Sequence, residues 1–191
     1  MEFNLAILIS GRGSNMLNIV EASKHKKIKS KVKIVISNNT NSEGIKIAQK
    51  LGIKTEIISQ KKFLFKNDFE NMLHRSLINQ DIDLICLAGF MSILSEDFLQ
   101  KWENKVINIH PSLLPKFRGK NAVRQALEKK AKISGCTIHY VDKGVDTGKI
   151  IAQEKVTILD DDDEASLKKK ILKKEHKLYI YVLNMFEKGL I

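Results

Sequence analysis

The 191-residue chain has few residues of four kinds: two cysteines, two prolines, one tryptophan and four arginines. Cys86 and Cys136 are far apart in the sequence, and each lies in an apolar segment. This placement predicts two reduced, buried thiols rather than a disulfide framework. Neither the cysteines nor the five histidines have the spacing of a zinc site, so we expect no metal.

Long apolar runs are also absent. No stretch approaches the roughly 20 residues of a membrane span, and Met1 to Ser10 has neither a basic start nor a small-residue cleavage site. The sequence therefore predicts a cytoplasmic protein without membrane contact. A content of 43% hydrophobic and 29% charged residues is typical of a folded globular chain, and the length suits a single domain over residues 1–191.

Almost all of the positive charge is lysine. The formal net charge is +11, which is compatible with an anionic partner. Nucleic-acid-binding proteins usually use arginine for bidentate contacts, and the lysines here are spread through every segment, so we expect no nucleic-acid partner. Two interpretations stay open: a lysine-rich surface without a function, and attraction of phosphorylated or polycarboxylate small molecules.

Apolar runs of four to seven residues alternate with longer amphipathic stretches, which is typical of β-α units around a parallel sheet. We expect strands at 5–10, 32–37, 55–58, 84–88, 106–110, 136–141 and 148–156, and helices at 16–22, 43–51 (capped by Ser42), 68–79, 96–102, 122–129 and 164–188. Only six residues separate the last two strands, which predicts an antiparallel hairpin. The predicted fold class is α/β, with three layers in a Rossmann-like arrangement, a mostly parallel sheet, this hairpin and a long C-terminal helix.

The segment Ile107 to Pro115 holds both prolines and the densest chemistry of the chain. Side chains two apart on a strand share a face, so Asn108 and His110 should project together. Pro111 cannot donate to a sheet ladder, so the strand should end at His110, at the carboxyl edge where open α/β sheets bind ligands. The alternative is a strand that merely stops at a proline, with His110 as a satisfied core residue.

Three further segments are candidate parts of a site. Gly11 to Asn15 joins a strand to a helix, so its free amides and the helix dipole can hold a phosphate, although a plain glycine turn is the alternative. Ala88 to Met91 follows a buried strand and could wall a pocket for a flat heterocycle, or belong to the core. Asp146 lies in the hairpin connection, where a carboxylate near His110 would raise the imidazole pKa and orient the ring; a turn aspartate is the alternative.

Five strings, in this order, resemble the glycinamide ribonucleotide formyltransferases of purine biosynthesis: I-S-G-R-G-S-N at 9–15, L-A-G-F-M-S-I-L at 87–94, I-N-I-H-P-S-L-L-P at 107–115, T-I-H-Y-V-D-K-G-V-D-T-G at 137–148, and E-H at 175–176. The resemblance implies the formyltransferase fold and transfer of a formyl group from 10-formyltetrahydrofolate, as co-substrate, to the amino group of N1-(5-phospho-D-ribosyl)glycinamide. No metal takes part, and the enzyme would be a monomer or a homodimer.

The resemblance also implies roles for individual residues. Asn108, His110 and Asp146 would form the catalytic set, within a C-terminal part of about 105–191. In an N-terminal part of about 1–104, the phosphate would be bound by Gly13, Ser14 and Asn15, whereas Glu175 would accept hydrogen bonds from ribose hydroxyls. The folate-binding residues would be Lys66, Met91, Ser92, Ile93, Leu94, Asn108, Asp142, Lys143, Gly144 and Val145. Two positions depart from the family pattern: Lys66, where arginine is frequent, and Arg118, where proline is usual.

Three alternative functions remain. Methionyl-tRNA formyltransferases share this catalytic domain and add a C-terminal β-barrel domain, which we do not expect here. Formyltetrahydrofolate hydrolases use water as the acceptor and carry an N-terminal regulatory domain, which we also do not expect. A non-enzymatic basic binding module would leave Asn108, His110 and Asp146 without a purpose.

Overall fold

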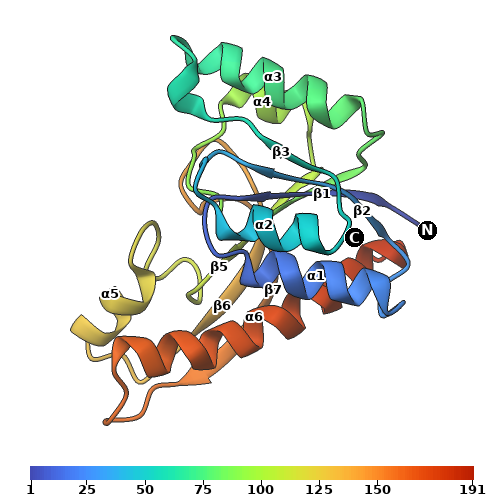
Figure 1. The fold of residues 1–191 in the computed structure, drawn as a ribbon. Coiled ribbons are helices and arrows are strands. Elements are labelled where there is room, and N and C mark those ends of the chain that lie inside the picture. The colour runs from blue at the N-terminus through green and yellow to red at the C-terminus, as the bar shows by residue number, and fades with distance from the viewer.

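One seven-stranded sheet runs through the computed structural model, which describes all residues from 1 to 191 (Figure 1). The strands are β1 (Asn4–Ile9), β2 (Lys31–Ser37), β3 (Thr55–Ile57), β4 (Leu84–Leu87), β5 (Val106–His110), β6 (Ile133–Tyr140) and β7 (Ile150–Thr157). The helices are α1 (Ser14–Lys24), α2 (Glu43–Lys50), α3 (Lys66–Ile78), α4 (Glu96–Lys101), α5 (Ala122–Glu128) and α6 (Glu164–Glu187), with a 3-10 turn at Gln60–Lys62.

The strand order is β3-β2-β1-β4-β5-β6-β7. Pairing is parallel from β3 to β5, whereas β6 pairs antiparallel with both β5 and β7. The expected parallel sheet, C-terminal hairpin and long last helix are therefore confirmed.

Two hydrophobic clusters, one on each face of the sheet, pack the three layers together. Along β1, Leu5, Ile7 and Ile9 pack into a cluster with α1, α2, α5 and α6. The alternate residues Ala6 and Leu8 pack into a cluster with α3 and α4 on the other face. This period-two alternation of wholly apolar residues is what a strand covered on both faces requires, and Figure 1 shows the two helix layers above and below the sheet.

Two local expectations need correction. Strand β6 begins at Ile133 rather than at 136, because β7 supplies cross-strand partners for Ile133 and Gly135. At Gly135 a side chain would collide with the Glu154 carbonyl, so glycine is required by close packing. Ser42 stands at the N-cap position of α2, but its hydroxyl donates to the Gly11 carbonyl oxygen at 2.9 Å instead of capping the helix.

Helix α6 begins where the acidic run predicted. The Asp163 carboxylate accepts from the backbone N–H of Ser166 at 2.7 Å, and the Ser166 hydroxyl accepts from the backbone N–H of Asp163 at 3.1 Å. These reciprocal bonds form a capping box. No helix in the structure combines the length and the apolar character needed to cross a membrane.

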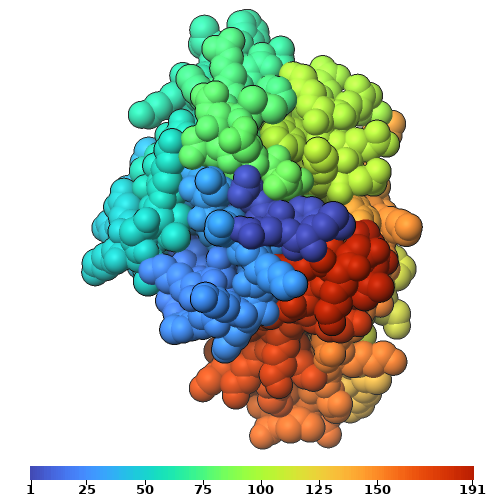
Figure 2. All heavy atoms as spheres, turned by 90° about the vertical axis from the view of Figure 1, so that its right-hand side faces the viewer, coloured from blue at the N-terminus to red at the C-terminus, as the bar shows by residue number.

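The two edges of the parallel strands differ in what they carry. At the amino edge the chain ends meet: the Met1 ammonium group donates to the Glu187 carbonyl, and Figure 2 shows the first residues beside the end of α6. At the carboxyl edge, the segments that follow β1, β4 and β5 lie side by side, because these three strands are neighbours in the sheet. Three of the predicted site segments lie at this edge: Gly11 to Asn15 after β1, Ala88 to Met91 after β4, and Asn108 with His110 at the end of β5.

Candidate active site

Strand β5 presents Asn108 and His110 on one face, as their spacing predicts. Both side chains reach the same carboxylate: the Asn108 amide donates to Asp146 Oδ1 at 3.4 Å, and His110 Nδ1 lies 3.2 Å from Asp146 Oδ2. The structure thus brings together the three residues of the predicted catalytic set, which are up to 38 positions apart in the sequence. His110 is buried, whereas Asn108 is half-buried and accessible to a ligand.

Asp146 is the centre of this cluster. It lies in the β6–β7 connection with a left-handed φ of 53°, a conformation that aspartate tolerates better than most residues. The backbone N–H of Gly119 donates to Asp146 Oδ2 at 2.8 Å. The carboxylate is therefore fixed from two loops, one after β5 and one after β6.

His139 is a member of the cluster that the sequence did not predict. It is buried on β6 directly opposite Asn108, and its Nε2 lies 3.3 Å from Asn108 Nδ2 and 3.5 Å from Asp146 Oδ1. Its Nδ1 donates to the Tyr140 carbonyl at 2.8 Å, which leaves Nε2 facing the cluster. The pairing register of β5 and β6, which sets Asn108 opposite His139, is what places His139 in the cluster.

Burial controls the ionisation of His110. It lowers the pKa of the imidazole below its ordinary value, and it outweighs the opposing effects of the Phe117 carbonyl and the Asp146 carboxylate. The Asp146 carboxylate raises the pKa of His110 as expected, but burial outweighs it and the net shift is downward. His110 Nε2 donates to the Phe117 carbonyl at 2.8 Å, so both ring nitrogens face acceptors.

Burial acts on Asp146 in the opposite sense to its hydrogen bonds. By itself burial would raise the pKa of this carboxyl group, but the adjacent His139, the hydrogen bond from the Gly119 N–H and the adjacent His110 hold the pKa below its ordinary value. Asp146 is therefore ionised at neutral pH.

The loop after β1 (Gly11 to Asn15), which we call the glycine loop, has the geometry of an anion site. Gly13 occupies the N-cap position of α1 with a left-handed φ of 76°, and Ser14 is exposed at the first turn. No side chain caps the helix, so its free N–H groups and its dipole remain available to a phosphate. Gly44 of α2 packs directly against Gly13 and donates its N–H to the Gly11 carbonyl at 3.0 Å.

Asn15 and Glu175, predicted to bind the phosphoribosyl part of a substrate, are in contact. Asn15 Nδ2 donates to Glu175 Oε2 at 2.8 Å, and both side chains are buried. Burial raises the pKa of Glu175, and the bond from Asn15 offsets part of that rise. The amide oxygen of Asn15, Oδ1, is buried without a hydrogen-bond partner.

The loop after β4, which we call the lip (Met91 to Leu94), lies between the glycine loop and the cluster in strand order. Met91 is 68% and Ile93 59% exposed, whereas the Leu94 side chain packs into the core. The backbone N–H of Met91 donates to Ser10 Oγ at 2.7 Å, which ties the lip to the end of β1.

The β6–β7 connection flanks the lip from the other side. Asp142 accepts from the Gly144 N–H at 3.1 Å and from the Thr147 hydroxyl at 2.6 Å, so it shapes the loop itself. Lys143 pairs at 3.4 Å with Glu96, the first residue of α4, and Val145 is exposed.

Lys66 lies apart from these groups, at the start of α3. Its ammonium group pairs with Glu70 at 3.6 Å, and the side chain is 40% exposed.

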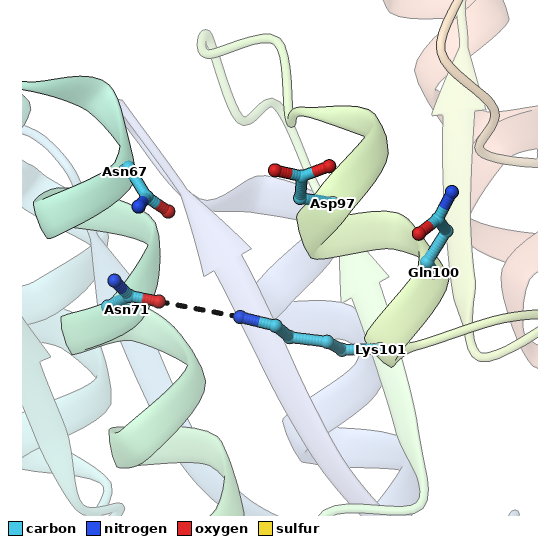
Figure 3. Close-up of a pocket in the computed structure, with 5 residues that line it drawn as sticks. All are labelled: Asn67, Asn71, Asp97, Gln100 and Lys101. Carbon is cyan, nitrogen blue, oxygen red and sulfur yellow. Dashed lines mark hydrogen bonds between the residues drawn. The ribbon is translucent and has the colours of Figure 1, made fainter.

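Two grooves lie outside the predicted site. Between α3 and α4 is a polar groove of about 500 Å³ (Figure 3), lined by Asn67, Asn71, Asp97, Gln100 and Lys101. Between β7 and α6 is a groove of about 360 Å³ that holds five lysines: Lys155, Lys170, Lys173, Lys174 and Lys177. No group of three or more His, Cys, Asp or Glu side chains in the structure could hold a metal ion.

Comparison with known proteins identifies one family. The formyl transferase family model matches residues 3–183. The phosphoribosylglycinamide formyltransferase of Escherichia coli K12 is 36% identical over 186 residues, which cover 97% of this chain and 88% of that protein. The trifunctional purine biosynthetic protein adenosine-3 is 46% identical in Drosophila melanogaster and 40% identical in Homo sapiens. The chain spans only 14% and 18% of the lengths of these two relatives, while 97% of this chain is covered.

Solved structures agree with the sequence comparisons. Glycinamide ribonucleotide transformylase 1 from Symbiobacterium toebii superposes with a TM-score of 0.96 at 36% identity, covering 98% of this chain and 89% of that one. Phosphoribosylglycinamide formyltransferase from Anaplasma phagocytophilum gives a TM-score of 0.91 at 41% identity, covering 98% and 87%.

Proposed function

Because this chain belongs to the formyl transferase family, and within it to the phosphoribosylglycinamide formyltransferases, we propose that it transfers the formyl group of 10-formyltetrahydrofolate to the amino group of N1-(5-phospho-D-ribosyl)glycinamide. The reaction serves de novo purine synthesis. The observation that carries the proposal is the Asn108–His110–Asp146 cluster. The glycine loop and the lip follow β1 and β4, the next strands in the sheet, so the proposed phosphate and folate regions lie on the same edge as the cluster.

The chemical step begins with attack of the substrate amine on the formyl carbon. The carbonyl oxygen gains negative charge as the carbon becomes tetrahedral, and donors aimed at that oxygen lower the barrier. The half-buried Asn108 amide supplies one such donor when the substrate oxygen replaces one of the two long contacts that its Nδ2 makes with His139 and Asp146, at 3.3 and 3.4 Å. His110 supplies a second when the substrate oxygen replaces the Phe117 carbonyl as the acceptor of its Nε2 proton.

The proton balance involves Asp146 and His110. The attacking amine loses a proton, and the folate nitrogen gains one as its bond to the formyl carbon breaks. The ionised Asp146 carboxylate, 3.2 Å from His110 Nδ1, stabilises the imidazolium that forms when His110 takes up a proton. His139 and the Gly119 N–H hold Asp146 in place, and no covalent enzyme intermediate is needed.

The phosphoribosyl group fits the β1–α1 end of the site. Gly13, Ser14 and Asn15 provide backbone N–H groups and polar side chains for the phosphate at an uncapped helix N-terminus. Glu175 is in contact with Asn15 and would accept hydrogen bonds from ribose hydroxyls, and the unpartnered Asn15 Oδ1 would be an additional acceptor.

The folate fits between the lip and the β6–β7 connection. Met91, Ile93 and Val145 are apolar side chains exposed by 68%, 59% and 47%, and a flat pterin ring would cover such surfaces. The remaining folate contacts would be backbone edges and polar atoms of Ser92, Leu94, Asn108, Asp142, Lys143 and Gly144. Lys66 would face the carboxylates of the glutamate part as a point charge.

The site draws on both ends of the chain, and we therefore propose that residues 1–191 act as one domain. Asn15 of α1 meets Glu175 of α6, and β1 and β5 lie in one sheet, so phosphate binding and catalysis are not separable pieces. Cys86 and Cys136 are free and buried, which fits a cytoplasmic protein. The proposed partners are small molecules only.

A competition between acceptors tests this function. Purified protein with 10-formyltetrahydrofolate is offered glycinamide ribonucleotide, charged initiator tRNA, or water alone. We expect formylation of glycinamide ribonucleotide and neither of the other products. Formylation of the tRNA alone would assign the chain to the methionyl-tRNA formyltransferases, and release of formate without an acceptor would make it a hydrolase.

A further inference from the structure

Glu70 is a buried carboxylate that none of the proposed steps uses. It lies in the middle of α3 and is only 3% exposed. Its Oε1 accepts from the backbone N–H of Ser95 at 2.7 Å, and its Oε2 accepts from the Ser95 hydroxyl. A buried carboxylate is stable only when it is well paired. Here both carboxylate oxygens accept hydrogen bonds from Ser95.

Ser95 directly follows the last residue of the lip, Leu94. Its hydroxyl also accepts from the Phe98 N–H at 3.2 Å and so caps α4. Between β4 and Ser95 the chain has no regular secondary structure. Side-chain hydrogen bonds hold it instead: Met91 N–H to Ser10 Oγ at 2.7 Å, Ser92 Oγ to Gln60 Oε1 at 2.9 Å, and the two bonds from Ser95 to Glu70.

The same carboxylate holds Lys66. Lys66 Nζ lies 3.6 Å from Glu70 Oε1, one helical turn earlier on α3. The ion pair restricts a long side chain that otherwise samples many rotamers. Glu70 therefore links two groups that are distant in the sequence: the ammonium group of Lys66 and the end of the lip.

We propose that Glu70 is a positioning residue for the folate co-substrate: it fixes the lip at Ser95 and aims Lys66 at the folate carboxylates. This inference rests on the proposed function, because it takes Lys66 and the lip as folate contacts. Since Glu70 acts on binding and not on the reacting atoms, its loss should weaken folate affinity and leave the chemical step nearly unchanged.

The chain contains a matched control. Glu187 is also a buried carboxylate, 7% exposed, and it accepts from the backbone N–H and the hydroxyl of a single serine, Ser30, at 2.7 and 2.6 Å. Ser30 directly precedes β2, so this pair lies at the amino edge of the sheet, opposite the site. Removing either carboxylate destabilises the fold in the same way, but only Glu70 lies beside the lip.

The experiment compares Glu70→Leu with Glu187→Leu. We expect both variants to lose thermal stability to a similar extent. Only Glu70→Leu should raise the Kd for 10-formyltetrahydrofolate, measured by calorimetry, and its KM, by about tenfold, the order expected for a lost charged hydrogen bond. For Glu70→Leu the kcat and the KM for glycinamide ribonucleotide should stay within about twofold of wild type. A similar rise in folate Kd for both variants would show a merely structural role and overturn the proposal.

A conservative variant separates the two contacts. In Glu70→Gln the amide can still bond Ser95 through both of its polar atoms, but the charge that holds Lys66 is gone. We expect most of the folate affinity to return, with a remaining weakening that disappears when Lys66→Gln is already present. If Glu70→Leu does not fold, Ser95→Ala takes its place, and an unchanged folate Kd in that variant overturns the lip contact.

Failure of this inference differs from failure of the proposed function. A wild type that binds folate without formylating glycinamide ribonucleotide contradicts the function alone. Equal folate Kd values for wild type and Glu70→Leu contradict the positioning role alone. A wild type that binds no folate contradicts both.

Discussion

At the residue scale, the site depends on one carboxylate, Asp146. It is contacted by Asn108, His110, His139 and the Gly119 N–H, which come from two strands and a loop. Buried polar clusters of this kind lose most of their function when one member is removed, because the others are left unpaired. Substitutions here should therefore act on turnover far more than on substrate affinity.

The first prediction concerns His110→Ala and Asp146→Asn. Each should lower kcat by about 10²- to 10⁴-fold, the range for loss of a general acid-base group, while folate binding stays measurable by calorimetry. Asp160→Asn, which removes one carboxylate from an exposed ion pair with Lys132, serves as a control and should retain wild-type turnover. Full activity of both site variants would contradict the mechanism.

The second prediction concerns pH and His110. Its pKa in the folded protein lies below the ordinary value of 6.5, so the unfolded chain binds more protons once the pH falls below about 6.5. Stability from keeping His110 neutral is thus present at higher pH and lost on acidification. Between about pH 7.5 and 5.5, the Tm of wild type should fall more than that of His110→Asn. Parallel curves would show that His110 titrates normally.

Site residues that lie on one strand could be predicted from the sequence, whereas contacts between residues of different strands could not. The period of two on a strand and Pro111 were enough to place Asn108 and His110 together. Asp146 was a candidate from its place in the hairpin connection, but only the resemblance assigned it to the same catalytic set as His110, since no local pattern links the two. His139 was missed because its place opposite Asn108 follows from the β5–β6 register, and the segment between those strands gives no signal of it.

At the element scale, the glycine loop (Gly11 to Asn15) is shaped by the start of α2. A side chain at Gly44 would lie 2.5 Å from Ile9 Cδ1, 3.1 Å from Gly13 Cα and 3.2 Å from the Gly11 carbonyl oxygen. The Ser42 hydroxyl bonds that same carbonyl, which explains why it does not cap α2. The sequence placed Ser42 at the N-cap correctly, but it contained no sign that the glycine loop competes for the hydroxyl.

The third prediction is that Gly44→Ala damages both the fold and the proposed phosphate site. Overpacking should cost about 1–3 kcal/mol of unfolding free energy, or roughly 2–4 °C in Tm for each kcal/mol at this chain size. The KM for glycinamide ribonucleotide should rise, whereas the KM for folate should not. Gly11→Ala, where a side chain meets nothing within 4 Å, should keep the wild-type Tm. A Gly44→Ala variant with normal Tm and KM would mean that α2 does not shape the loop.

At the whole-molecule scale, the sequence predicted the fold class and the family, and the structure and the comparisons confirm both. The fold class could be predicted because the hydrophobic periodicity that indicates it extends over many residues, so a local exception does not change the result. The meaning of the +11 charge could not be predicted, since composition does not say where charges gather. In the groove between β7 and α6, Lys170 and Lys174 are paired with acidic residues, whereas Lys155, Lys173 and Lys177 form no ion pair.

The fourth prediction follows from this charge. If it attracts the phosphorylated substrate, kcat/KM should fall as salt rises from about 10 to 300 mM, because the Debye length shrinks from roughly 30 to below 8 Å. Lys173→Gln combined with Lys177→Gln should flatten that dependence. A kcat/KM that is independent of salt would favour a lysine-rich surface without a function.

The measurement that tests the account most directly is the ratio of formylated glycinamide ribonucleotide to tetrahydrofolate released in one reaction, read by mass spectrometry. Direct transfer within the Asn108–His110–Asp146 cluster predicts a ratio of about one, because each formyl group that leaves the folate is captured by the amine. Tetrahydrofolate that appears with formate and without the formylated amine would contradict the account.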